Sequence, residues 1–240
     1  MMNATPRKIQ PRRALRAIRN LIADPERTDQ VFEVLDALSG NTQHLGLERL
    51  SRTATGQRLL REQHALIDAL KDRDALRALP ADSLGRAYCA FMERESLAAD
   101  GLVDASRARA DEETDPQQRW YNERLRDMHD LWHVVTGYGR DGFGEVCLLA
   151  FTYAQTRNRG IAFIAFFGTR EVSRELGLRR AWRATLEGFH HGRRAAWLPA
   201  QDWQALLALP LDAARQALGI EAPQHYALPV SDQQGTALAA

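Results

Sequence analysis

The stretch RLRDMHDLWHVVTGYGRDGFGE, residues 124–145, places two histidines and several carboxylates among apolar residues and glycines. Its first half has apolar residues at three- and four-residue spacing, which is typical of an amphipathic helix. Gly137, Gly139, Gly142 and Gly144 then predict a turn. The stretch therefore predicts two successive helices joined by a tight turn, with polar side chains near their junction.

The same helical spacing recurs along the chain, whereas the period-two alternation of half-buried strands is nowhere sustained. Of the 240 residues, 45% are hydrophobic, and a chain of this length and composition can form one stable core. The sequence therefore predicts an all-α fold, a single compact domain of about eight helices.

We expect residues 1–12 to form a flexible N-terminus, residues 13–225 the helical domain, and residues 226–240 a flexible C-terminal tail. The N-terminus is rich in arginine and has no acidic residue before Asp24. This pattern suits a mitochondrial transit peptide or a basic first helix. The helical spacing of ALRAIRNLI favours the helix. Residues 98–115 are polar and acid-rich, which predicts an exposed loop.

Composition excludes some classes of partner and structure. The formal net charge is +1, so we expect no nucleic-acid partner. Cys89 and Cys147 are too few for a disulfide framework and are expected to be reduced core residues. The most apolar run, IAFIAFF at 161–167, is too short to cross a bilayer; it suits a buried helix or a lipid-facing surface.

The spacing of His129 and His133 is one helical turn, so both imidazoles point from the same face of the helix. Two imidazoles in this arrangement can bind one metal ion. Asp130 can reach the edge of that site or orient one of its ligands. If the glycine turn folds the next helix back, Glu145 in its first turn faces the histidines. The pattern predicts a site for Zn²⁺, Fe²⁺ or Mn²⁺ between two successive helices, with ordinary core histidines as the alternative.

Two other functions are weaker interpretations of this stretch. GYGRDG at 137–142 has the spacing of a dinucleotide-binding loop, but it follows a predicted helix instead of a strand. The pair HD at 129–130 also occurs in helical phosphohydrolases, which need a further histidine and a distal aspartate. His64 and Asp202 are available, but their segments lack the supporting pattern.

Beyond spacing, the sequence resembles a known family. HDLWH at 129–133, followed by eleven residues and Glu145, is similar to the HDxxHx11E signature of the coenzyme Q biosynthesis protein four family. Other segments resemble that family in the same order: LIADPERTDQVFEVLDALSG, TGQRLL, LPADSLGRAYCAFM, GFHHGRRAAWL and PLDAARQALGI. The resemblance covers about residues 13–220, and the four signature positions show no departure.

The resemblance implies that His129, Asp130, His133 and Glu145 bind a divalent metal ion: zinc, iron, manganese or cobalt. It implies a role in ubiquinone biosynthesis, as a lyase that decarboxylates ring carbon C1 of a prenylated 4-hydroxybenzoate intermediate, with hydroxylation at that carbon. It identifies no catalytic residue beyond the ligands. The alternative is a non-enzymatic, lipid-binding scaffold that organises a ubiquinone-biosynthesis complex around a structural metal.

Two histidines, one carboxylate and open coordination positions are typical of non-haem Fe(II) oxygenases, whereas zinc has no redox chemistry. The ligand set therefore permits an oxidative step without requiring one. Four protein ligands would instead favour the scaffold, because a closed site leaves no position for substrate.

The partners that the resemblance implies are a polyprenylated aromatic precursor of ubiquinone, other ubiquinone-biosynthesis proteins and a membrane surface contacted peripherally. A homodimer is a further candidate assembly. The implied location is the cytoplasmic face of the inner membrane in a bacterium, or the matrix face of the inner mitochondrial membrane in a eukaryote. A prenyl tail needs an apolar groove. Candidates for its lining, or for ordinary helix packing, are Phe151, Tyr153, Ile161, Phe163, Ile164, Phe166 and Phe167. Candidate carboxylate-binding arginines are Arg86, Arg157, Arg193 and Arg194.

Overall fold

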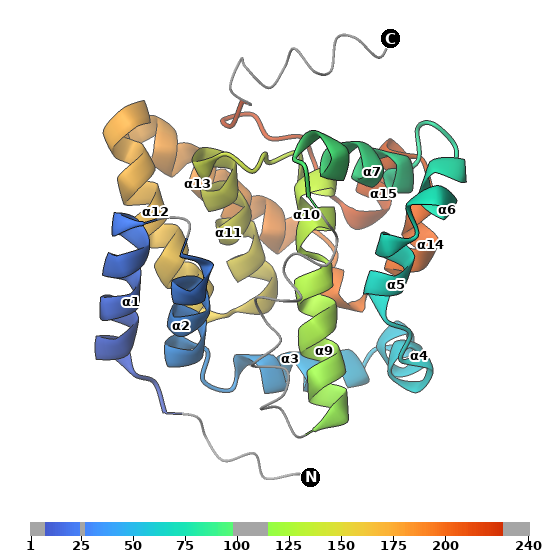
Figure 1. Cartoon of the computed structure of the whole chain (residues 1–240), viewed down its shortest axis with the longest axis horizontal. Coiled ribbons are helices and arrows are strands. Elements are labelled where there is room, and N and C mark those ends of the chain that lie inside the picture. The colour runs from blue at the N-terminus through green and yellow to red at the C-terminus, as the bar shows by residue number, and fades with distance from the viewer. Residues whose placement is uncertain (1–7, 25–26, 98–114, 228–240) are drawn as a thin grey trace.

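The computed structural model of the chain describes residues 8–24, 27–97 and 115–227. Its regular structure in these ranges is helical. The only strand-like feature of these ranges is one antiparallel bridge between Ser83 and Pro210. This confirms the predicted all-α fold, which Figure 1 shows as one body. The helices are α1 (Pro11–Ala23), α2 (Thr28–Leu38), α3 (Thr42–Ser51), α4 (Ala54–Glu62), α5 (Leu66–Lys71), α6 (Arg73–Ala78), α7 (Leu84–Arg94), α9 (Pro116–Asp127), α10 (His129–Thr136), α11 (Gly142–Thr156), α12 (Arg159–Leu176), α13 (Leu178–Arg194), the 3₁₀ helix η1 (Leu198–Ala200), α14 (Trp203–Leu207) and α15 (Leu211–Leu218).

Within the described ranges the helices outnumber the eight expected, because residues 42–78 divide into four short helices, α3 to α6. The side-chain oxygens of Thr53 and Asp72 accept hydrogen bonds from backbone N–H groups at the starts of α4 and α6. Such caps favour the start of a new helix. Gln63 ends α4 in the left-handed conformation, with φ at 47°. These local interactions interrupt a segment whose apolar spacing is otherwise continuous.

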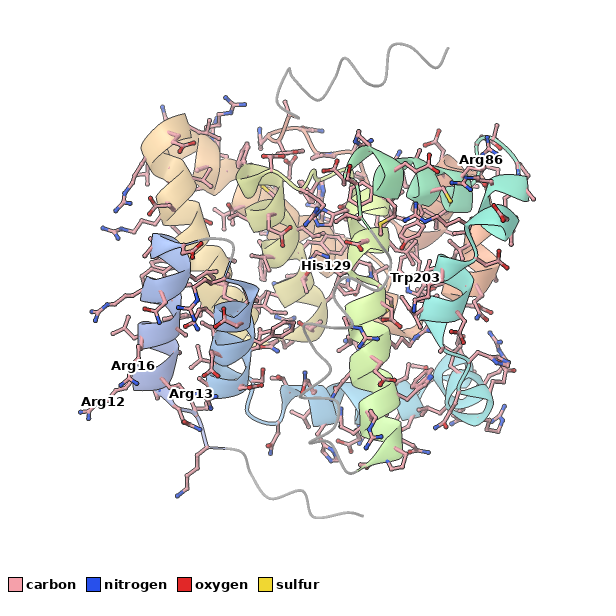
Figure 2. The ribbon with its side chains drawn as sticks, viewed as in Figure 1. Arg12, Arg13, Arg16, Arg86, His129 and Trp203 are labelled. Atoms are coloured by element: carbon pink, nitrogen blue, oxygen red, sulfur yellow. The ribbon has the colours of Figure 1, made fainter. Side chains whose placement is uncertain are left out.

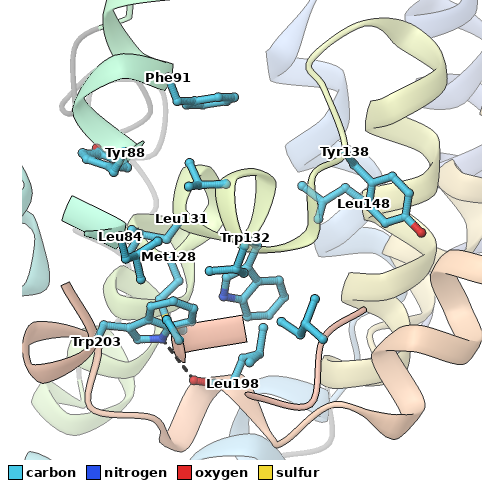
Figure 3. Close-up of a cluster of buried hydrophobic side chains, with 14 of the residues drawn as sticks. Leu84, Tyr88, Phe91, Met128, Leu131, Trp132, Tyr138, Leu148, Leu198 and Trp203 are labelled. Carbon is cyan, nitrogen blue, oxygen red and sulfur yellow. Dashed lines mark hydrogen bonds between the residues drawn. The ribbon is translucent and has the colours of Figure 1, made fainter. Parts of the chain in front are cut away.

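The largest cluster of buried apolar side chains surrounds α10, which contacts α7, α9, α11 and α15. Leu131 and Trp132 of α10 lie in this cluster together with Leu84 of α7 and Trp203 of α14 (Figure 3). The indole N–H of Trp203 donates to the carbonyl of Leu198 at 3.1 Å. Each large side chain buried in this way contributes about 1.5–3 kcal/mol through removal of apolar surface from water. Burial of these side chains therefore fixes the position of α10 in the core.

Helix α11 packs most extensively on α13, and two glycines allow the backbones to approach closely. A Cβ atom placed on Gly188 would lie 2.4 Å from the carbonyl oxygen of Cys147, and one on Gly192 would lie 2.5 Å from that of Phe151. Real Cβ atoms do not come so close to a backbone oxygen. The α11–α13 contact therefore requires glycine at these positions.

A second apolar cluster joins α1, α2 and α12 at one edge of the molecule (Figure 1). Pro11 occupies the first turn of α1, where its fixed φ favours a helix start. Ala14 and Ile18 are buried, while Arg12 and Arg16 extend outward into solvent (Figure 2). The basic segment near the N-terminus therefore forms a packed amphipathic helix, as its spacing predicts.

The predicted flexible ends, residues 1–12 and 226–240, stay predictions, because most of their residues lie outside the described ranges. Helix α1 begins at Pro11, before the predicted start at residue 13, and Tyr226, assigned to the tail, is buried. Residues 1–7, 98–114 and 228–240 lie outside the described residues. The middle range contains all of the predicted loop, 98–115, except Asp115. Both cysteines are buried free thiols, as expected. Among the helices described, none has the length and apolar character needed to span a bilayer.

Substitution of Gly188 tests the close approach of α11 and α13. Gly188→Ala should lower the free energy of unfolding by about 1–3 kcal/mol, because the new methyl group meets the Cys147 carbonyl. Gly142→Ala is the matched control, since a Cβ there meets nothing within 4 Å and should change stability by less than about 0.5 kcal/mol. Urea denaturation measures both variants. Equal stability of Gly188→Ala and the parent protein would contradict the close packing.

Candidate metal centre

His129, His133 and Glu145 come together where α10 is followed by α11. The Nε2 atom of His129 lies 3.5 Å from one Glu145 carboxylate oxygen, and Nε2 of His133 lies 3.2 Å from the other. One ligand atom from each of these residues falls within 4.8 Å of the other two. Figure 2 places His129 on α10 near the middle of the view. The three side chains could therefore hold one metal ion.

The turn between α10 and α11 creates this arrangement. Gly137 ends α10 in the left-handed conformation, with φ at 78°, which glycine adopts at little cost. Asp141 then caps α11, because one of its carboxylate oxygens accepts hydrogen bonds from the N–H groups of Phe143 and Gly144, each at 3.1 Å. The chain reverses within these few residues. Glu145, in the first turn of α11, consequently faces the histidines of α10.

His133 is the buried member of the group, with only 1% of its surface exposed. Its Nδ1 lies 2.9 Å from the carbonyl oxygen of Tyr138 and donates to it, since a carbonyl only accepts. The ring of Phe91 stacks on the imidazole at a centroid distance of 5.6 Å. Nε2 is thereby directed at Glu145 but makes no well-aligned hydrogen bond. An unsatisfied buried nitrogen is costly, so this atom fits the role of a metal ligand.

His129 has Asp130 on one side and Glu145 on the other. Its Nδ1 lies 3.3 Å from the Asp130 carboxylate, which leaves Nε2 facing Glu145. Burial opposes a charge on His129, but the hydrogen bonds and charges of both carboxylates outweigh burial and raise the pKa of His129 to about 10. Burial also opposes ionisation of Glu145, yet the two histidines hold the pKa of Glu145 well below its usual range. Protonated imidazole thus neutralises the carboxylates, a role that a divalent cation could take over.

Asp130 is not part of the group whose ligand atoms converge. Burial alone would raise the pKa of Asp130, but the hydrogen bond and charge of His129 lower it below its usual value. The carboxylate therefore supports the His129 ring from its outer side, as carboxylates hydrogen-bonded to metal-binding histidines commonly do. Three converging protein groups, unlike four, leave coordination positions open.

Two residues that sequence reasoning missed hold the elements of this site from far along the chain. Arg215 of α15 donates from Nε to the carbonyl of Val135 at 3.0 Å and from Nη2 to that of Val134 at 3.2 Å. These carbonyls belong to the last turn of α10 and have no partner within the helix. Tyr226 contacts the turn before α11. Neither residue has a spacing signal, because both act through tertiary contacts.

The weaker interpretations of the sequence do not fit the structure. The glycine-rich turn follows α10 and not a strand, which removes the basis for a dinucleotide loop. Asp202 pairs with Arg58 at 2.5 Å and caps α14, while His64 is exposed; neither belongs to the metal-binding group. The described residues therefore do not assemble the additional ligands of a helical phosphohydrolase.

The predicted carboxylate-binding arginines lie away from the site. Arg86 donates to the backbone carbonyl of Arg77. Arg157 follows the last turn of α11, at the opposite end from Glu145. Arg193 and Arg194 end α13, beside that same end of α11, as the contact of Gly192 with Phe151 shows. A role for these arginines at the metal centre is not favoured.

The fold and the site define a class: an all-helical protein in which two histidines and one glutamate from successive helices can hold a metal ion. More specifically, residues 11–224 match the family described as "Coenzyme Q (ubiquinone) biosynthesis protein Coq4", and the chain belongs to this family. The resemblance seen in the sequence is thereby confirmed.

Relatives of this family share moderate identity with the chain. A ubiquinone biosynthesis protein COQ4, mitochondrial, from Yarrowia lipolytica is 28% identical over 181 residues, which are 73% of this chain and 65% of that protein. Proteins of the same name from Neosartorya fischeri and Pyricularia oryzae are 30% and 31% identical, over 71% and 70% of this chain and 58% and 54% of theirs. The chain thus spans less than two thirds of the length of these curated relatives.

A solved structure supports the fold. The crystal structure of a protein from Nostoc punctiforme superimposes with a TM-score of 0.67 at 23% identity, covering 90% of this chain and all of that one. At this identity the likeness shows that the helical architecture is shared.

Replacement of Arg215 tests how the end of α10 is supported. Arg215→Met should lower the free energy of unfolding by about 1–3 kcal/mol, because the Val134 and Val135 carbonyls lose their donors. Asp212→Asn removes only an exposed ion pair with Arg215 and should change stability by less than about 0.5 kcal/mol. Chemical denaturation compares the two. A larger effect of Asp212→Asn would show that the ion pair, and not the cap, matters.

Proposed function

We propose that this chain acts in ubiquinone biosynthesis as a metal-dependent lyase that removes the carboxylate from ring carbon C1 of a prenylated 4-hydroxybenzoate intermediate, with hydroxylation at that carbon. Membership of the Coq4 family supports the pathway. The observation that carries the metal dependence is the convergence of His129, His133 and Glu145 around the unsatisfied Nε2 of a buried histidine.

In this proposal the ligands are His129, His133 and Glu145, and Asp130 orients His129 and does not complete the set. Zinc, iron, manganese and cobalt all accept such ligands. When bound, the ion supplies a Lewis acid for the substrate carboxylate and for negative charge that develops on the ring.

The protein's own residues have separate tasks in the reaction. Loss of carbon dioxide breaks the bond between the ring and the carboxylate, and its electron pair stays on the ring carbon. Where that carbon is protonated, Asp130 can move the proton, because its carboxylate lies beside the site without converging on it. Where it is hydroxylated, dioxygen accepts two electrons and one water is consumed, so that the products are the ring hydroxyl, carbon dioxide and hydrogen peroxide. The His129 side chain is 31% exposed, so one edge of the site faces solvent.

The alternative is a non-enzymatic scaffold with a structural metal. A structural site would be closed by four protein ligands. Three groups converge among the described residues, and Asp130 stays outside that group, which favours the enzyme.

Removal of one imidazole tests metal binding. His133→Ala should lose the bound metal in elemental analysis, because the remaining groups cannot hold the ion as tightly, while the helix content is retained. His64→Ala is the matched control, since His64 is exposed and lies outside the group. Unchanged metal content in His133→Ala would refute the proposed site.

The reaction itself is tested by turnover. Protein loaded with iron, manganese, cobalt or zinc is supplied with a prenylated 4-hydroxybenzoate and oxygen, and release of carbon dioxide is measured. Activity should be absent from His133→Ala. Absence of turnover with all four metals, although metal is bound, would favour the scaffold.

We further propose that the chain contacts a membrane surface through α12 and α13. Of the apolar residues expected to line a lipid groove, Phe151 and Ile164 are buried in the core, and only Phe166 is exposed, at 52%. Its ring lies 5.6 Å from Trp182 of α13. Leu178, at 65% exposure, and Leu186, at 49%, continue the same stripe along α13.

The charges around this stripe suit anionic lipid. The exposed arginines Arg170, Arg179 and Arg183 belong to the same two helices as Phe166 and Leu186. An apolar stripe flanked by arginines is typical of helices that lie in the interface of an anionic bilayer. The corresponding location is the cytoplasmic face of a bacterial inner membrane or the matrix face of the mitochondrial one.

Introduction of negative charge into the apolar stripe tests membrane contact. The double substitution Leu178→Glu and Leu186→Glu should abolish sedimentation with vesicles of phosphatidylglycerol and phosphatidylcholine, because carboxylates cannot enter the interface of an anionic bilayer. Leu45→Glu on α3 changes an equally exposed leucine, at 57%, and should bind vesicles like the parent. Normal vesicle binding by the double variant would contradict the proposal, and a change in its oligomeric mass alone would identify a dimer interface instead.

A further inference from the structure

We propose that Tyr226 is a positioning residue of the metal centre: its hydroxyl holds the turn that joins the two ligand-bearing helices, so that the affinity for a divalent metal depends on it. This inference rests on the proposed function, because it presumes that His129, His133 and Glu145 bind the ion.

The hydroxyl of Tyr226 joins two points of the turn between α10 and α11. It accepts a hydrogen bond from the N–H of Gly139 at 3.0 Å and donates one to the carboxylate of Asp141. Burial, together with the neighbouring Asp141 carboxylate, raises the pKa of Tyr226 above its usual range, so the hydroxyl keeps its proton. One side chain therefore bridges the turn from the outside.

The bridge continues to Glu145. The second carboxylate oxygen of Asp141 caps α11 by accepting from the N–H groups of Phe143 and Gly144. The backbone carbonyl of Asp141 accepts from the N–H of Glu145 at 2.9 Å. The direction in which α11 starts, and with it the position of the Glu145 carboxylate, is consequently set by an aspartate that Tyr226 holds.

The same turn also orients His133. The carbonyl oxygen of Tyr138 accepts from Nδ1 of His133 at 2.9 Å, which directs Nε2 toward Glu145. Tyr138 precedes Gly139 directly, and its ring packs edge-to-face on Tyr226 at a centroid distance of 5.5 Å. A displacement of the turn would therefore move a ligand on each of the two helices.

The segment that carries Tyr226 is itself anchored to α13. Glu187 of α13 accepts hydrogen bonds from the N–H groups of Gln224 and His225, each at 2.9 Å. The ring of Phe143 packs against Tyr226 at 5.3 Å. Tyr226 thus links the turn to α13 through residues 224–225, and no candidate ligand is among its hydrogen-bond partners.

The test is the metal affinity of Tyr226→Phe, which keeps the aromatic contacts and removes only the hydroxyl. Purified protein is titrated with Zn²⁺ against a chromophoric chelator, and Co²⁺ absorption reports the geometry of the site. Loss of a group that orients metal ligands typically weakens binding by about 10–100-fold. We expect at least a 10-fold loss for this variant and an altered Co²⁺ spectrum.

Tyr121→Phe is the matched control, because it removes another buried tyrosine hydroxyl in a different apolar cluster. It should bind Zn²⁺ like the parent protein. Thermal melts of the metal-free proteins separate weak binding from unfolding. If Tyr226→Phe does not fold, Glu187→Ala, which releases residues 224–225 and keeps the tyrosine, carries the same expectation.

The outcomes distinguish this inference from the proposed function. Unchanged Zn²⁺ affinity and Co²⁺ spectrum in a folded Tyr226→Phe, alongside loss of metal in His133→Ala, would overturn the positioning role and leave the metal site standing. Failure of the parent protein to bind metal, or equal binding by His133→Ala, would overturn the proposed function and this inference together.

Discussion

Burial of α10 is the constraint on which the rest of the structure depends. One face of this short helix, with Leu131 and Trp132, lies in the largest apolar cluster, and the other carries His129 and His133. A helix of this length is unstable alone, so its conformation comes from packing and from partners at its ends. The core therefore determines where the two imidazoles lie, and the site needs only a third group from the next helix.

Much of the site could be predicted because its information is local. The one-turn spacing of His129 and His133 puts both on one helix face, and the glycine turn folds Glu145 back toward them. Asp130 shows the limit of this reasoning: adjacency along the chain places it near the site, but only the structure shows it against Nδ1 of His129.

Other features depend on contacts between distant segments, and the sequence pattern could not reveal them. Arg215 and Tyr226 support the site from about 80 residues away and stand at no recognisable spacing. The helix count differed for another reason, because caps such as Thr53 divide a continuous apolar pattern. Phe151 and Phe166 belong to equally apolar segments, yet one is core and the other surface, since helix packing decides which side is covered.

The dependence of α10 and its turn on Arg215 and Tyr226 has a consequence for biosynthesis of the protein itself. A ribosome produces all three candidate ligands long before it reaches α15, so the nascent chain passes through a stage with both histidines and the glutamate but without their distal supports. The arrangement of the three candidate ligands is therefore complete only after the last helices have been synthesised and docked.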